Sequence, residues 1–134
     1  MTGLMAGKVK ILAVDDEDFN LDIIVHYLEE AGFEVIPAED GDVALQKLAS
    51  IPDIALVVLD RKMPRLDGIE VLREMKRTPG MEAIPVIIQT AVYEFEQKSV
   101  LNLEGAYGYL TKPYDGDVLV SLVRAALKNS PLAR

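Results

Sequence analysis

The stretch IALVVL at residues 54–59 is apolar at every position and is followed at once by Asp60. Six residues suit a strand, and a strand without polar alternation is covered on both of its faces. Such strands belong to parallel sheets, in which each neighbour is reached through a crossover that is usually a helix. The stretch therefore predicts the central strand of an α/β sheet.

Shorter apolar runs lie on both sides of this stretch, separated by longer segments with helical spacing. The other predicted strands are residues 9–14, 33–37, 84–89 and 106–110. The predicted helices are residues 18–31 with Gly32 as the stop, a helix capped by Asp40, a helix capped by Asp67, residues 94–104, and a helix capped by Asp115. The last helix is expected to turn a set of apolar residues inward: Val118, Leu119, Leu122, Val123, Ala126 and Leu127.

This alternation limits the topology to a few solutions. Right-handed crossovers place helices on both faces of a parallel sheet, and five such units commonly adopt the strand order 2-1-3-4-5. Pro37 agrees with that order, because a strand proline belongs on an edge and the order puts the second strand there. We expect one three-layer α/β domain with five helices over residues 1–134, with its core at about 9–128 and a short tail at each end.

Composition excludes several functional classes. The chain has 14 basic and 22 acidic residues, which argues against direct binding of nucleic acid. The apolar runs are far shorter than the roughly 20 residues that a membrane span needs. There is no apolar signal segment at the N-terminus and no cysteine. We expect a cytoplasmic protein that crosses no membrane.

The polar residues of interest directly follow the ends of predicted strands: Asp15, Asp16, Asp60, Thr90 and Lys112. Open α/β sheets bind ligands at this edge, in the crevice where the strand order reverses. In the predicted order the crevice lies between the first and third strands, so the three aspartates should converge.

Three neighbouring carboxylates repel one another, and each pair at about 4 Å costs on the order of 4 kcal/mol at an effective dielectric of about 20. A retained proton, a divalent cation or a lysine would each relieve this repulsion. Mg²⁺ prefers oxygen ligands of this kind, and Lys112 can add positive charge. An aspartate in these surroundings is equipped to act as a nucleophile toward a phosphoryl group.

With these residues in place, the chain resembles the receiver domain of bacterial two-component response regulators, which has a flavodoxin-like fold. The matching stretches are VDD at residues 14–16, DRKMPRLDG at 60–68, TA at 90–91 and GAYGYLTKP at 105–113. Four motifs in this order at strand ends make a specific signal, and the resemblance extends over roughly residues 9–128.

The resemblance implies a role for each matching residue. Asp60 would accept a phosphoryl group from the phosphohistidine of a sensor histidine kinase or a phosphotransfer protein. Mg²⁺ would be bound by Asp60, by Asp16 directly, by Asp15 through water and by the backbone carbonyl of Lys62. Thr90 and Lys112 would contact the phosphoryl oxygens, and Tyr109 would change rotamer on activation. The Lys112-Pro113 peptide bond is expected to be cis.

The same resemblance describes the output. Residues 94–104, the strand at 106–110 and the last helix would form a switch face that signals to a partner or to an output domain outside this chain. The sequence identifies no downstream partner, and it leaves open a phosphorylation-dependent homodimer. Such a protein is a signalling switch, which catalyses only its own phosphorylation and dephosphorylation.

Three rival functions can be stated. A haloacid-dehalogenase-type phosphatase also uses an aspartate and Mg²⁺, but it needs a second acid two residues after the nucleophile, where this chain has Lys62. A nucleotide or flavin module would need a phosphate-binding glycine loop, and neither common pattern is present. A degenerate receiver that only binds protein is the third reading, and the complete set of motif residues argues against it.

Two basic residues, Arg61 and Lys62, directly follow the predicted acceptor, which departs from the commoner patterns of the family. We hypothesise that the Lys62 side chain alters the lifetime of the acyl phosphate, because it would place charge where the attacking water enters.

Overall fold

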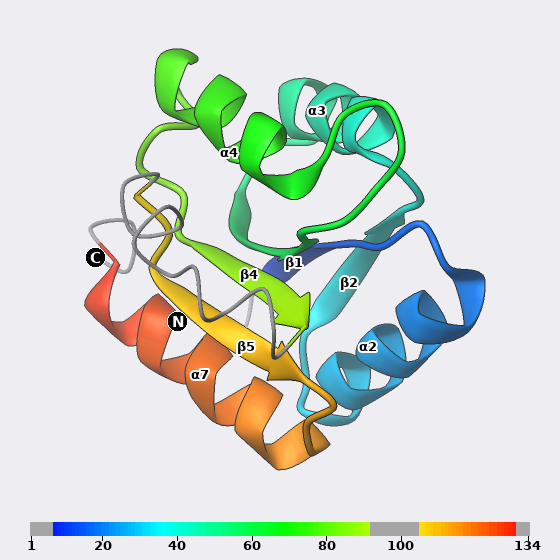
Figure 1. Cartoon of the computed structure of the whole chain (residues 1–134). Helices are drawn as coiled ribbons and strands as arrows, with labels where there is room; N and C mark the ends of the chain where they lie inside the picture. The colour runs from blue at the N-terminus through cyan, green and yellow to red at the C-terminus, as the bar shows by residue number, and fades with distance from the viewer. Residues whose placement is uncertain (1–6, 92–104, 131–134) are drawn as a thin grey trace.

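Five parallel strands form one sheet in the order β2-β1-β3-β4-β5 in the computed structural model, which describes residues 7–91 and 105–130 (Figure 1). The strands are β1 (Lys10–Val14), β2 (Glu34–Ala38), β3 (Ile54–Asp60), β4 (Val86–Ala91) and β5 (Gly108–Lys112). The helices of the described residues are α2 (Asp18–Glu30), α3 (Gly41–Ser50), α4 (Gly68–Arg77) and α7 (Gly116–Asn129). The predicted sheet order is confirmed, and the helix predicted at 94–104 lies outside the described residues.

The helices cover the sheet in two layers. Helices α2 and α7 pack on one face, and α3 and α4 pack on the other (Figure 1). Alternation along each strand divides the buried residues into two clusters, one for each face. On the α2/α7 face the strand residues are Ile11, Ala13, Leu56, Val58, Ile87 and Leu110. On the α3/α4 face they are Leu12, Val14, Ala38, Ile54, Val57, Leu59, Val86 and Ile88.

The ends of the helices follow from local chemistry. The Asp40 carboxylate accepts a hydrogen bond from the Val43 amide at 2.9 Å, and Asp67 forms a capping box with Glu70, so both predicted caps are confirmed. Gly32 follows α2 with a φ of 99°, a left-handed conformation that favours glycine. Asp115 occupies the N-cap position of α7, but its side chain accepts no capping hydrogen bond.

Four strands end later than predicted: β2 at Ala38, β3 at Asp60, β4 at Ala91 and β5 at Lys112. Asp60, Thr90 and Lys112 therefore lie within strands and not beyond them. The reason is backbone pairing, which continues through Thr90 opposite Thr111 and through Ala91 opposite Lys112. Polar side chains do not end a strand while its backbone still has a partner.

One residue of α7 was predicted on the wrong side. Val118 was expected to face inward, but it is 49% exposed. The buried residues of α7 are instead Leu119, Val123 and Ala126. Val118 comes one residue before Leu119, so its side chain points about 100° away from this buried face, toward solvent.

Pro37 lies in β2, which is an edge strand as predicted. Among the described residues, no helix combines the length and apolar character needed to cross a bilayer.

Candidate functional site

Three polar side chains share the α2/α7 face at the carboxyl edge of the sheet. Val14 lies opposite Leu59 in the pairing of β1 with β3, so Asp15 and Asp60 each come one residue later. Asp60 in turn lies opposite Gln89 of β4. Asp15, Asp60 and Gln89 are thus neighbours across three adjacent strands, continuing the rows of buried apolar residues behind them.

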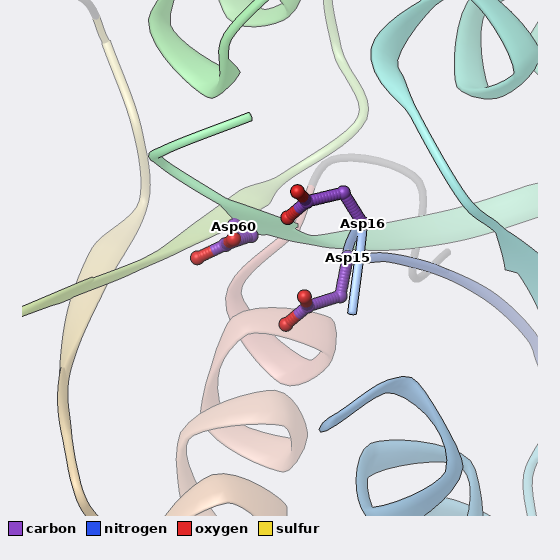
Figure 2. Close-up of side chains that lie close together, drawn as sticks. All are labelled: Asp15, Asp16 and Asp60. Atoms are coloured by element: carbon purple, nitrogen blue, oxygen red, sulfur yellow. The ribbon is translucent and has the colours of Figure 1, made fainter. Parts of the chain in front are cut away.

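The three predicted aspartates converge. Their side chains point toward a shared space from the ends of β1 and β3 (Figure 2), and one oxygen from each lies within 4.8 Å of the others. Asp15 is 0% exposed and Asp60 is 5% exposed, whereas Asp16 is exposed. Two of the three carboxylates are therefore removed from the water that would normally stabilise their charge.

Lys112 supplies the nearest positive charge. Its Nζ donates a hydrogen bond of 2.8 Å to Asp60 Oδ1 and lies 3.7 Å from Asp15 Oδ2. Burial by itself would lower the pKa of Lys112, but the bond to Asp60 and the charges of Asp60 and Asp15 raise it overall. The lysine therefore remains charged and is shared by two acids.

One lysine does not fully compensate these acids. Burial raises the pKa of Asp60 to about 6, with a further contribution from the charge of Asp15, although the bond to Lys112 acts in the opposite direction. Burial also raises the pKa of Asp15, opposed first by the hydrogen bond that its Oδ1 accepts from the Glu17 amide at 3.0 Å. Both carboxylates thus ionise at a cost in this arrangement.

The donor set fits a hard divalent cation. Asp15 Oδ2 is buried without a hydrogen-bond partner among the described residues, and it belongs to the cluster of three carboxylates. Mg²⁺ and similar ions take oxygen ligands of this type and would relieve the remaining repulsion. The residues at the site are therefore suited to such an ion.

The other predicted site residues lie around this cluster. Thr90 is 1% exposed and directly follows Gln89, so its side chain starts from the α3/α4 face of the sheet. Tyr109 of β5 is partly buried and packs against the apolar cluster of that same face. Lys62 has an exposed side chain in the loop after β3. The Lys112-Pro113 peptide bond is cis, as predicted.

A glycine fixes the backbone beside Asp60. The Gly68 amide donates to the Arg61 carbonyl at 2.9 Å, and a Cβ added at Gly68 would lie 2.4 Å from the Asp60 carbonyl oxygen. Only glycine allows the start of α4 to approach β3 this closely. In the sequence Gly68 appeared only as the last residue of the matching stretch at 60–68, and the structure adds this contact.

Two residues beside the site were missed in the sequence. Gln89 is 1% exposed, and its Oε1 accepts a hydrogen bond of 2.5 Å from the Tyr114 hydroxyl. In the sequence Gln89 stands out as the one amide at the end of the run at 84–89, and Tyr114 stands out because it directly follows Lys112-Pro113. Neither indicated the contact, which joins residues 25 apart.

The sequence matches the family model of the response regulator receiver domain over residues 11–124. It is similar to the alkaline phosphatase synthesis transcriptional regulatory protein PhoP of Bacillus subtilis, with 41% identity over 126 residues that cover 92% of this chain and 50% of that protein. The chain thus spans about half the length of the curated relatives it matches.

Solved structures agree with this match. A response regulator receiver domain protein from Clostridium thermocellum superimposes with a TM-score of 0.83 at 34% identity, covering 94% of this chain and 99% of that one. The chemotaxis protein CheY4 of Vibrio cholerae superimposes with a TM-score of 0.82 at 28% identity, covering 89% of this chain and 98% of that one.

Proposed function

The chain belongs to the response regulator receiver domains of two-component signalling, and from this premise we propose that Asp60 is its phosphoryl acceptor. The donor is the phosphohistidine of a sensor histidine kinase or a phosphotransfer protein. The observation that carries the proposal is the geometry of Asp60, buried beside Asp15 and Asp16 with Lys112 Nζ 2.8 Å from its Oδ1. A nucleophilic carboxylate needs these surroundings to meet a negatively charged donor.

The transfer exchanges one phosphorus bond for another. A carboxylate oxygen of Asp60 attacks phosphorus, an oxygen–phosphorus bond forms and the bond from phosphorus to the imidazole nitrogen breaks. The electron pair stays on that nitrogen, and the product at Asp60 is an acyl phosphate. Lys112 lies beside the attacking carboxylate and would contact the phosphoryl oxygens, together with the hydroxyl of Thr90.

We further propose a Mg²⁺ site made by Asp60, Asp16, the Lys62 backbone carbonyl and, through water, Asp15. The bound ion would supply positive charge that neutralises the phosphoryl oxygens during transfer. The buried Oδ2 of Asp15, which accepts no hydrogen bond among the described residues, and the spacing of the three carboxylates support this assignment.

The proposed signal leaves through a face formed by residues 94–104, β5 and α7. Phosphorylation would shift a two-state equilibrium there by drawing Thr90 and Tyr109 toward the phosphoryl group. Residues 94–104 lie outside the described residues, so this part rests on the family. The downstream partner would be a protein, either an output domain outside this chain or a separate molecule. A phosphorylation-dependent homodimer would use the same face.

We propose that residues 1–134 form one receiver domain with its core at about 9–128, and that the protein acts in the cytoplasm. The B. subtilis relative is named a transcriptional regulatory protein, but this chain matches only half of it. We do not assign DNA binding to the present residues, since their net charge is −8.

The test is incubation with Mg²⁺ and acetyl phosphate, followed by intact mass. We expect the full chain to gain one phosphoryl group, the Asp60→Ala variant to gain none, and the matched Asp22→Ala variant, which removes an exposed acid of α2, to gain one. An unmodified wild-type chain would instead favour a degenerate receiver. Sustained hydrolysis of p-nitrophenyl phosphate would favour the phosphatase.

A further inference from the structure

Gln89 is a buried amide that follows three buried apolar residues of β4, Val86, Ile87 and Ile88. It lies opposite Asp60 and its side chain is 1% exposed. Within the described residues its Nε2 has no hydrogen-bond partner, so the amide is held only through Oε1. Burying an amide whose nitrogen has no hydrogen-bond partner is destabilising relative to an apolar side chain. The hydrogen bond from the Tyr114 hydroxyl to Oε1 is the contact that this buried amide makes possible.

Tyr114 is the second residue after Lys112, with Pro113 between them. Its hydroxyl donates to Gln89 Oε1, which ties the turn after β5 back to β4 beside Asp60. Burial raises the pKa of Tyr114, and the charges of Asp15 and Asp60 raise it further. The hydroxyl therefore stays protonated and keeps its role as donor.

Tyr114 packs with only part of its surface against the apolar cluster of the α2/α7 face. A cavity of about 450 Å³ lies between α2 and the turn, lined by Ile23 and Tyr27 on one side and by Pro113 and Tyr114 on the other. Gln89 and Lys112 line it as well. Because one side of the Tyr114 ring borders open space, the hydrogen bond to Gln89 is the directional contact that limits where the turn can lie.

We propose that Tyr114 and Gln89 are positioning residues whose hydrogen bond holds Lys112 Nζ against Asp60. Strand β5 ends at Lys112, so a shift of the turn is transmitted directly to the lysine backbone. With the bond in place, the ammonium group is already located where the phosphoryl oxygens arrive. The inference rests on the proposed phosphoacceptor function of Asp60.

The test compares Tyr114→Phe and Gln89→Leu with the wild-type full chain, using acetyl phosphate and Mg²⁺. We expect the limiting rate of phosphorylation to fall about ten-fold in both variants, since small misplacements of a charged group reduce rates by up to about a hundred-fold. The matched control is Ser50→Ala, which removes a hydroxyl that donates to the Gln46 carbonyl at 2.9 Å, on an exposed serine of α3. Its rate should equal the wild-type rate.

A double-mutant cycle separates positioning from general damage. In a Lys112→Met background there is no ammonium group to position, so Tyr114→Phe should cause no further loss. An equal loss in both backgrounds would overturn the inference.

A crystal structure of Tyr114→Phe gives an independent measure, because we expect the distance from Lys112 Nζ to Asp60 Oδ1 to exceed the present 2.8 Å. An unchanged distance together with an unchanged rate would refute the positioning role alone. A wild-type chain that is never phosphorylated on Asp60 would refute the phosphoacceptor function and this inference with it.

Discussion

Asp60 carries its charge in a place that disfavours charge. Desolvation and the neighbouring Asp15 act against ionisation, and the single bond from Lys112 offsets only part of this, so the pKa of Asp60 is raised to about 6. A group in this state is reactive because a partner that brings positive charge, or a reaction that spreads the negative charge, improves its surroundings. The same energetics should be measurable as stability.

We predict that Asp60→Asn stabilises the domain in the absence of divalent ions. The difference between the ordinary pKa of 3.8 and the folded value of about 6 sets an upper bound of about 3 kcal/mol, and screening by nearby solvent reduces it to about 1–2 kcal/mol. Chemical denaturation in EDTA at pH 7 measures the change. Asp22→Asn, at an exposed acid of α2, should leave the free energy of unfolding unchanged.

The sign of the pH dependence follows from the same values. An unfolded Asp60 ionises near pH 3.8 and a folded one near 6, so between these values ionisation favours the unfolded chain. The advantage of Asp60→Asn over wild type should therefore be full above pH 6 and should disappear below about pH 3.8. An advantage that grows on acidification would contradict this account.

A second prediction concerns the lifetime of the phosphorylated form. Lys62 is exposed and lies two residues after Asp60, where its charge can act on the water that attacks the acyl phosphate. We expect Lys62→Ala to change the dephosphorylation rate by less than about five-fold. An exposed charge contributes about 1 kcal/mol or less to the barrier, and this energy corresponds to about five-fold in rate. Loss of phosphoryl by intact mass measures it. A rate equal to that of Lys128→Ala, an exposed lysine of α7, would eliminate the hypothesis.

At the scale of elements, the site depends on how closely α4 approaches β3. The first residue of α4 is Gly68, and its missing side chain lets the helix start against the Asp60 carbonyl. The capping box of Asp67 and Glu70 then fixes the first turn, so the backbone that carries Asp60 is held from the side of the helix.

We predict that Gly68→Ala destabilises the domain and slows phosphorylation of Asp60. The new Cβ would meet the Asp60 carbonyl oxygen at 2.4 Å, and overpacking of this kind costs about 1–3 kcal/mol. Denaturation and the acetyl phosphate assay measure the two effects. Gly108→Ala is the matched control, because its Cβ would meet only Leu122 at an ordinary 3.4 Å. Equal losses in the two variants would show that the close approach is unimportant.

The elements also show what sequence reasoning could reach. The order of the sheet followed from alternation and from the apolar run at 54–59, because burial on both faces leaves a pattern in the residues themselves. The ends of β4 and β5 were placed too early, since pairing such as Ala91 with Lys112 depends on the partner strand. The bond between Tyr114 and Gln89 could not be foreseen, because it depends on which strands become neighbours and which face each side chain occupies.

At the scale of the whole molecule, one edge of the sheet collects charge from distant parts of the chain. Strand β1 brings Asp15 and Asp16, β3 brings Asp60 and β5 brings Lys112, while the rows behind them are apolar. The central strands therefore cannot separate without dispersing the charge cluster. Any ion bound to the three carboxylates should for this reason stabilise the global fold and not only a loop.

We predict that Mg²⁺ raises the melting temperature of the full chain. An ion that binds only the folded state adds about 2.7 kcal/mol at a concentration a hundred times its Kd, and the effect saturates logarithmically. Thermal unfolding over increasing MgCl₂, with NaCl adjusted to constant ionic strength, measures it. Asp16→Ala should largely remove the rise, because an exposed ligand is lost without disturbing the buried pair. Asp22→Ala should retain it. A rise of equal size in all three proteins would mean that Mg²⁺ acts through the general acidity of the chain, and the metal site would have to be abandoned while the role of Asp60 could still stand.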